Sequence, residues 1–283
     1  MAETKTKARK VFRQLAEHDD QIIFSTHSSL LLDVAFFDEV IRVESVHFSE
    51  NNERRVESKV WQLPMQKMIN DLKSRYPSAQ PTEQSMRELY SHAYHPNRSE
   101  GFFAQRVILV EGSTEQYSLP IYSEACGYAL DKLNISVVDC GGKGSIDRLY
   151  CIFNELGIPC YILFDYDKNN SDKNIIEKSK DLLKLVGESP ATPEKIIITD
   201  NVACFPDKWE IDLANEIENV KLLTNEAQKF LGLPKDTGKP LVARYIAKKV
   251  TSQTSPYVPN SIKKILEKAV NVEWKKSCLS SIQ

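Results

Sequence analysis

The sequence predicts an α/β protein built around a parallel sheet, followed by a helical C-terminal segment. Three observations support this fold class. Short apolar runs alternate with stretches of helical period. The run that ends at Asp165 is apolar throughout, as expected of a strand buried on both faces. The last 70 residues or so lack such runs. With 283 residues, 41% of them hydrophobic, the chain can form one large domain or two small ones.

The first hundred residues predict a small βαβ-like unit followed by a connector. The expected elements are a helix at 4–18, a strand at 21–26, a helical turn at 30–34, a strand at 39–46 and a polar hairpin at 49–59. Prolines at 77, 81 and 96 interrupt the helical pattern of residues 64–100, so this stretch reads as a helical connector.

The strand–helix alternation restarts after residue 105. Strands are expected at 106–111, 135–140, 160–165 and 195–199. Helices are expected between them at 114–126, at 145–156 with Ser145 as its cap, and at 171–186. Further helices are expected at 213–217, 225–231, 241–250 and 262–269.

Charge and composition exclude several classes of protein. The net charge of −2 combines −1 over residues 1–100, −7 over residues 101–240 and +6 over residues 241–283, so an acidic middle precedes a basic tail. No apolar run is long enough to span a bilayer, and the N-terminus lacks the apolar core of a signal peptide. The six cysteines include no Cys-x-x-Cys pair. We therefore expect free thiols, no zinc site, no membrane partner and a cytoplasmic location.

Carboxylates follow two of the expected strands at their carboxyl ends. Glu111 and Glu115 come after the first strand of the second unit, and Asp165 and Asp167 come at the end of the third. Sites in parallel α/β sheets form at this edge, and Mg²⁺ or Mn²⁺ prefers such oxygen ligands. The residues thus favour a site for two divalent cations that act on a phosphodiester. Alternatively, these acids are helix caps or solvated loop residues.

A glycine-rich turn, Gly141-Gly142-Lys143-Gly144, follows the second of these strands. It shapes the metal crevice or is an ordinary strand-to-helix turn, and from it Lys143 could touch a phosphate. The sequence does not decide between these alternatives.

Val110-Glu111-Gly112-x-x-Glu115 after one strand and Asp165-Tyr166-Asp167 after another resemble a TOPRIM domain. Residues 21–33, with His27, resemble the last strand and switch-histidine loop of ABC-type ATPases, although a serine replaces the usual proline at Ser29. The order of these segments is similar to the C-terminal part of the OLD (overcoming lysogenization defect) family of nucleases. No phosphate-binding loop precedes His27, so ATP would act only through an absent N-terminal ATPase half.

The resemblance implies a domain plan and further site residues. It implies an ATPase tail at 1–63, a connector at 64–103, a TOPRIM catalytic domain at 104–205 and a basic helical segment at 206–283. Glu210 and Asp212 are candidate additional metal ligands, or caps of the following helix. Lys239 is a candidate for stabilising charge in the transition state, or a solvated residue. His27 would sense the γ-phosphate of ATP in a complete ATPase but is expected to be idle here.

The combined expectation is a divalent-metal-dependent DNA endonuclease. Two Mg²⁺ or Mn²⁺ ions would be held by Glu111, Glu115, Asp165, Asp167, Glu210 and Asp212, with Lys239 beside them. The lysines expected along the DNA backbone are Lys248, Lys249, Lys263, Lys264, Lys275 and Lys276. The resemblance also implies a homodimer formed through the ATPase half and a role in phage defence. The alternative is a non-catalytic TOPRIM module that binds metal for regulation or as a scaffold.

Overall fold

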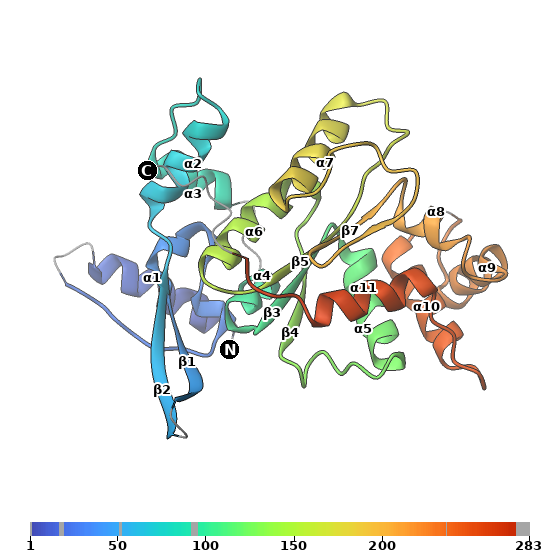
Figure 1. Ribbon diagram of the computed structural model, residues 1–283, viewed down its shortest axis with the longest axis horizontal. Coiled ribbons are helices and arrows are strands. Elements are labelled where there is room, and N and C mark those ends of the chain that lie inside the picture. Colours follow the sequence, from blue (N-terminus) through green and yellow to red (C-terminus); the bar gives the residue numbers. More distant parts are fainter. Residues whose placement is uncertain (1, 17–19, 51–52, 92–95, 236, 276–283) are drawn as a thin grey trace. The chain divides into compact units, whose positions relative to one another are not determined.

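A computed structural model describes residues 2–16, 20–50, 53–91, 96–235 and 237–275 (Figure 1). The chain divides into two compact units, one consisting mainly of Met1–Phe103 and the other mainly of Ala104–Asn154 together with the residues from Ile158 onwards. Within the described ranges, no helix combines the length and the apolar character needed to cross a membrane.

The first unit contains a hairpin and several short helices. Its helices are α1 (Ala2–Ala16), α2 (Met65–Arg75), α3 (Glu83–Ser91) and α4 (Pro96–Ser99), with 3₁₀ turns η1 (Ser29–Leu31), η2 (Val34–Glu39) and η3 (Glu100–Phe103). Its strands are β1 (Ile41–Glu50) and β2 (Glu53–Gln62). Buried Phe37, Leu63, Met68 and Met86 form part of its core, and the ring of Phe37 meets Tyr90 edge-on at 5.3 Å.

The expected βαβ-like start of the chain is wrong. Residues 21–26 form no strand, and β1 pairs with β2 in an antiparallel hairpin, with Val43 opposite Val60. The hairpin extends well beyond the polar segment 49–59 expected to form it. An apolar run becomes a strand only where a neighbouring strand accepts its backbone hydrogen bonds, whereas a polar segment can form one if its partner follows directly. The helices expected within 64–100 are confirmed as α2, α3 and α4.

The second unit is built on a five-stranded, mostly parallel sheet, which confirms the predicted fold class. Its strands are β3 (Arg106–Val110), β4 (Ile135–Asp139), β5 (Cys160–Asp165), β6 (Ile197–Ile198) and β7 (Val202–Phe205). They lie in the order β4-β3-β5-β7-β6, and all neighbouring pairs except β6–β7 are parallel. The strand expected at 195–199 is only the two-residue antiparallel edge strand β6. The fourth parallel strand is β7, which the sequence analysis did not anticipate.

Helices cover both faces of this sheet. They are α5 (Ser113–Ala125), α6 (Ile146–Glu155), α7 (Lys173–Leu185), α8 (Trp209–Leu213), α9 (Val220–Leu231), α10 (Lys239–Thr251) and α11 (Asn260–Val270). Alternate strand residues such as Ile108 and Leu163 share one hydrophobic cluster with α5, α10 and α11. Buried Leu109 and Ile162 point to the other face, where Figure 1 shows α6 and α7. The short 3₁₀ turn η4 (Lys143–Ser145), which ends at Ser145, leads into α6.

Candidate functional site

Four carboxylates gather where β3 and β5 end, and we call them the acidic cluster: Glu111, Glu115, Asp165 and Glu210. Glu111 follows β3, and Glu115 lies on the first turn of α5. Asp165 ends β5, the strand next to β3, and Glu210 lies on α8 just after β7. Because parallel neighbouring strands end at one edge of the sheet, the residues that follow them are brought together.

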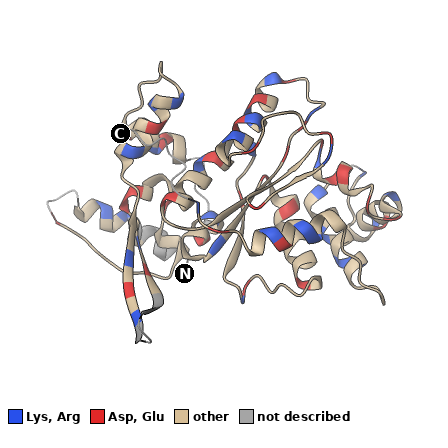
Figure 2. Cartoon of the chain, in the orientation of Figure 1, with Lys and Arg blue, Asp and Glu red and all other residues tan. Residues whose placement is uncertain are grey.

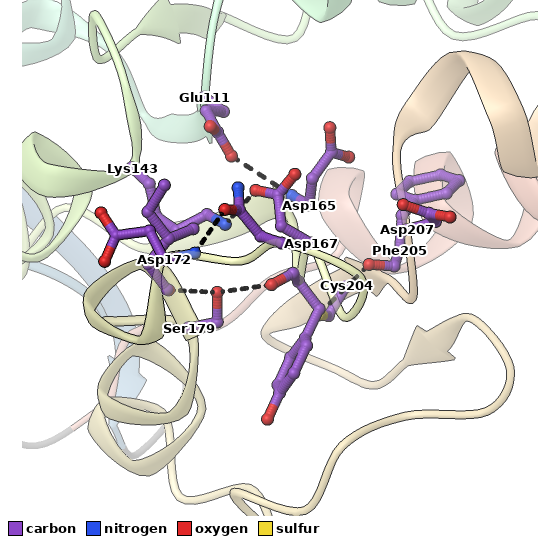
Figure 3. A network of polar contacts seen from close by, with 12 residues as sticks. Glu111, Lys143, Asp165, Asp167, Asp172, Ser179, Cys204, Phe205 and Asp207 are labelled. Carbon is purple, nitrogen blue, oxygen red and sulfur yellow. Dashed lines mark hydrogen bonds and ion pairs between the residues drawn. The ribbon is translucent and has the colours of Figure 1, made fainter. Parts of the chain in front are cut away.

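Backbone N–H groups hold three of these carboxylates in place. The N–H of Asp165 donates to Glu111 Oε2 at 3.3 Å (Figure 3), and that of Trp209 donates to Asp165 Oδ1 at 2.9 Å. The N–H of Gly112 donates to Glu115 Oε2 at 3.1 Å, at the start of α5. Each of these carboxylates retains oxygen lone pairs that these bonds do not use.

Burial and mutual repulsion make three of these carboxylates, Glu111, Glu115 and Asp165, harder to ionise. Burial, together with the charges of Glu111, Glu115 and Glu210, raises the pKa of Asp165 to about 9. Burial, with Glu111 and Glu210 adding to it, raises the pKa of Glu115 to about 7. Burial also raises the pKa of Glu111. These four groups therefore lie close enough to act on one another electrostatically.

The acidic cluster has no ion-pairing partner among the residues that the structure describes. Among the described residues, no three histidine, cysteine, aspartate or glutamate side chains are already arranged so that they could hold one metal ion.

Asp167 is engaged differently, in an ion pair with Lys143. Lys143 Nζ lies 2.6 Å from Asp167 Oδ2, and the two side chains are only 7% and 13% exposed (Figure 3). The glycine turn brings the lysine here. Gly142 has φ +114° and donates its N–H to the carbonyl of Glu111 at 2.8 Å. Lys143 opposes, and Asp167 reinforces, the raised pKa of Glu111, so this pair borders the acidic cluster.

Glu210 and Asp212 lie on different sides of α8. Residues two apart on a helix do not face each other. Glu210 affects the pKa of Asp165, whereas Asp212 accepts the N–H of Asp207 at 3.1 Å. Burial raises the pKa of Asp212, although the hydrogen bond from the Asp207 N–H opposes this rise. The structure therefore brings Glu210 to the acidic cluster and directs Asp212 toward the β7–α8 turn.

A cavity of about 710 Å³ is lined by both Lys239 and Glu210 of the acidic cluster. It is lined by residues of α5, α8, α9 and α10, including Glu210 of the acidic cluster and Lys239, the first residue of α10. Lys208 lines the same cavity and opposes the raised pKa of Glu111. Lys208 was not among the residues predicted from the sequence, because the β7 strand that positions it was not expected.

The other candidate lysines within the described residues form no ion pair with the acidic cluster. Lys248 is on the last turn of α10, roughly 14 Å along the helix axis from Lys239. Figure 2 shows basic residues along α10 and α11, and the four candidates there are exposed: Lys248, Lys249, Lys263 and Lys264. Lys275 donates to the carbonyl of Val186 at 2.9 Å.

The remaining candidate residues have no visible role in the site. Lys276, Cys278, His18, His92 and His95 lie outside the described residues. His27 is exposed in the first unit, between α1 and η1. Its ATP-sensing origin, like the ATPase origin of residues 1–63, stays a prediction.

Comparison with known proteins finds a family resemblance over the part of the chain that contains Glu111, Glu115 and Asp165. Residues 102–167 match the family described as "Overcoming lysogenization defect protein-like, TOPRIM domain". The Old nuclease of Escherichia phage P2 is 29% identical over 170 residues, which are 60% of this chain and 26% of that protein. The OLD nuclease of Thermus scotoductus is 27% identical over 191 residues, 66% of this chain and 33% of that protein. The chain therefore spans about a quarter to a third of the length of these relatives.

Two solved structures are also similar. The C-terminal region of the Xanthomonas campestris OLD protein is 20% identical, with a TM-score of 0.41 and coverage of 60% of this chain and 96% of that one. The C-terminal region of the Burkholderia pseudomallei OLD protein is 20% identical, with a TM-score of 0.41 and coverage of 59% and 98%.

Proposed function

We propose that this chain, which carries an OLD-like TOPRIM domain, is a divalent-metal-dependent nuclease module that hydrolyses phosphodiester bonds of DNA. One observation carries the proposal. Four carboxylates from separate elements meet at the sheet edge without an ion-pairing cation among the described residues. Such a cluster is costly when ionised, and bound cations offset that cost.

The donor set suits Mg²⁺ or Mn²⁺. All four groups of the acidic cluster are carboxylates, which hard divalent cations prefer, and no imidazole or thiol is needed. Glu111, Glu115, Asp165 and Glu210 would hold the cations. Asp167 could join them if Lys143 moved away. When bound, two divalent ions would activate a water molecule and stabilise the leaving 3′ oxygen.

The chain's own residues would orient the substrate and stabilise its charge. Lys239 lines the same cavity as Glu210, where its ammonium group would attract a phosphate oxygen. Lys208 is a second cation on that wall. The hydrogen bonds from Trp209 to Asp165 and from Asp165 to Glu111 would fix two of the carboxylates relative to each other.

The test is cleavage of supercoiled plasmid DNA with Mg²⁺ or Mn²⁺. We expect nicking or linearisation by the unaltered chain, and loss of it in Glu111→Gln and Asp165→Asn. Glu210→Gln and Asp212→Asn form a matched pair on α8. The first should slow cleavage far more, because Glu210 belongs to the acidic cluster and Asp212 caps the neighbouring turn. Metal-dependent stability without cleavage under any metal would favour the non-catalytic scaffold instead.

A further inference from the structure

The cavity beside Glu210 has the size and walls of a ligand site. Its volume of about 710 Å³ lies within the roughly 300–1,000 Å³ typical of small-molecule sites. Apolar side chains dominate its lining, including Trp209, Val242 and Ile246. A cavity of this kind suits a ligand with a flat, weakly polar body.

The charge around the cavity favours an anion. Its lining includes four exposed lysines, and Glu210 is the only carboxylate among the described residues that line it. The lysines come from three separate segments: Lys208, Lys221, Lys235 and Lys239. An apolar interior bordered by cations fits a ligand that joins a ring system to a phosphate.

Two largely buried residues on the cavity wall, Gln228 and Tyr122, have polar side chains with no hydrogen-bond partner among the described residues. Gln228 is 8% exposed and Tyr122 is 2% exposed. Their polar atoms are not fully enclosed, so they can meet solvent or a ligand in the cavity. A glutamine amide donates and accepts at once, as the edge of a nucleobase does.

We infer that this cavity receives one unpaired nucleotide of the DNA substrate, with its base near Gln228 and its phosphate near the lysines. The inference rests on the proposed nuclease function, because Glu210 is shared by the cavity and the acidic cluster. An unpaired base enters such a pocket at less cost than a paired one. The chain should therefore prefer DNA with an unpaired nucleotide over fully paired DNA.

The test compares two labelled duplexes of equal length and charge by fluorescence anisotropy, using the full chain in EDTA so that nothing is cleaved. One duplex carries a thymine opposite an abasic site, and the other is fully paired. We expect the first to bind about tenfold more tightly, a difference of about 1.4 kcal/mol. Gln228→Leu should lose most of this preference at little-changed thermal stability, since the amide has no hydrogen bond to lose among the described residues.

A matched pair of charge variants on α9 tests the cavity itself. Lys221→Met and Lys229→Met each remove one lysine from the same helix, but only Lys221 lines the cavity. The preference should fall in the first and persist in the second.

Several results would overturn the inference. Equal binding of the two duplexes would do so, as would a preference that survives both Gln228→Leu and Lys221→Met. Free dTMP that binds in the cavity without any preference between the duplexes would make it a small-molecule site instead. In each of these cases plasmid cleavage can persist, so the nuclease proposal stands or falls separately. A chain that neither binds nor cleaves DNA would remove both.

Discussion

Replacing Asp165 with asparagine should stabilise the cation-free chain while abolishing DNA cleavage. Burial and the neighbouring carboxylates Glu111, Glu115 and Glu210 raise the pKa of Asp165 to about 9. An acid whose pKa is raised by folding stabilises the protein at low pH, and this contribution is lost as pH rises from 3.8 toward 9. Asparagine carries no charge, and its Oδ1 can still accept the N–H of Trp209.

The size of the effect follows from the pKa shift. At pH 8 the solution is about four pH units above the ordinary pKa of an aspartate, and each unit corresponds to about 1.4 kcal/mol. The largest possible gain in the free energy of unfolding is therefore about 6 kcal/mol. Asp165 is only partly buried by exposed area, and water screens part of its charge. We expect a gain of about 2–4 kcal/mol, which raises the midpoint of thermal unfolding by about 5–10 °C for a unit of this size.

The assay is thermal unfolding followed by circular dichroism in EDTA at pH 8 and pH 5. The gain should shrink at pH 5, and the variant should lose the stabilisation that Mg²⁺ gives the unaltered chain. Asp200→Asn is the control, because Asp200 is an exposed aspartate paired with Lys268. It should change the unfolding midpoint little at either pH. A midpoint in Asp165→Asn that is unchanged or lower at pH 8 would refute the reasoning.

Three other predictions concern the surroundings of the same site. Binding of Mn²⁺, measured by calorimetry, should tighten at least about 100-fold from pH 6 to pH 8.5. The reason is that a proton must leave Asp165, whose pKa is about 9, and at lower pH a second proton must leave Glu115, whose pKa is about 7. An affinity for Mn²⁺ that does not change with pH would contradict this. Lys143→Met should lower the free energy of unfolding in urea by about 3 kcal/mol, because it leaves Asp167 buried without its cation. Adding Asp167→Asn should recover most of that loss, and no recovery would show that the pair is not the cause. Lys239→Ala should slow plasmid cleavage about 100-fold without changing the unfolding midpoint, and an unchanged rate would remove Lys239 from the site.

The sheet and the core of the candidate site could be predicted because they follow from local patterns. Apolar runs of strand length, separated by helical stretches, indicated β3, β4 and β5. The residues that end β3 and β5 had to meet, because those strands are parallel neighbours. For that reason Glu111 and Asp165 could be placed at one edge of the sheet from the sequence alone.

The remaining features depend on tertiary contacts that no local pattern encodes. Residues 21–26 have strand-like composition but no strand beside them, whereas the polar β2 forms because β1 precedes it directly. Glu210 and Asp212 read alike in sequence, and only the orientation of α8 directs Glu210 to the acidic cluster. Lys143 reaches Asp167 because Gly142 adopts a positive φ and docks on Glu111, which the composition of the turn permits but does not require.

Anomalous diffraction from crystals of the full chain soaked in Mn²⁺ would test the convergence of the acids most directly. Manganese density within bonding distance of carboxylate oxygens from both Glu111 and Asp165 is the expected result. Crystals that bind manganese elsewhere, or nowhere, at saturating concentration and pH 8.5 would contradict the metal site and the chemistry proposed for it.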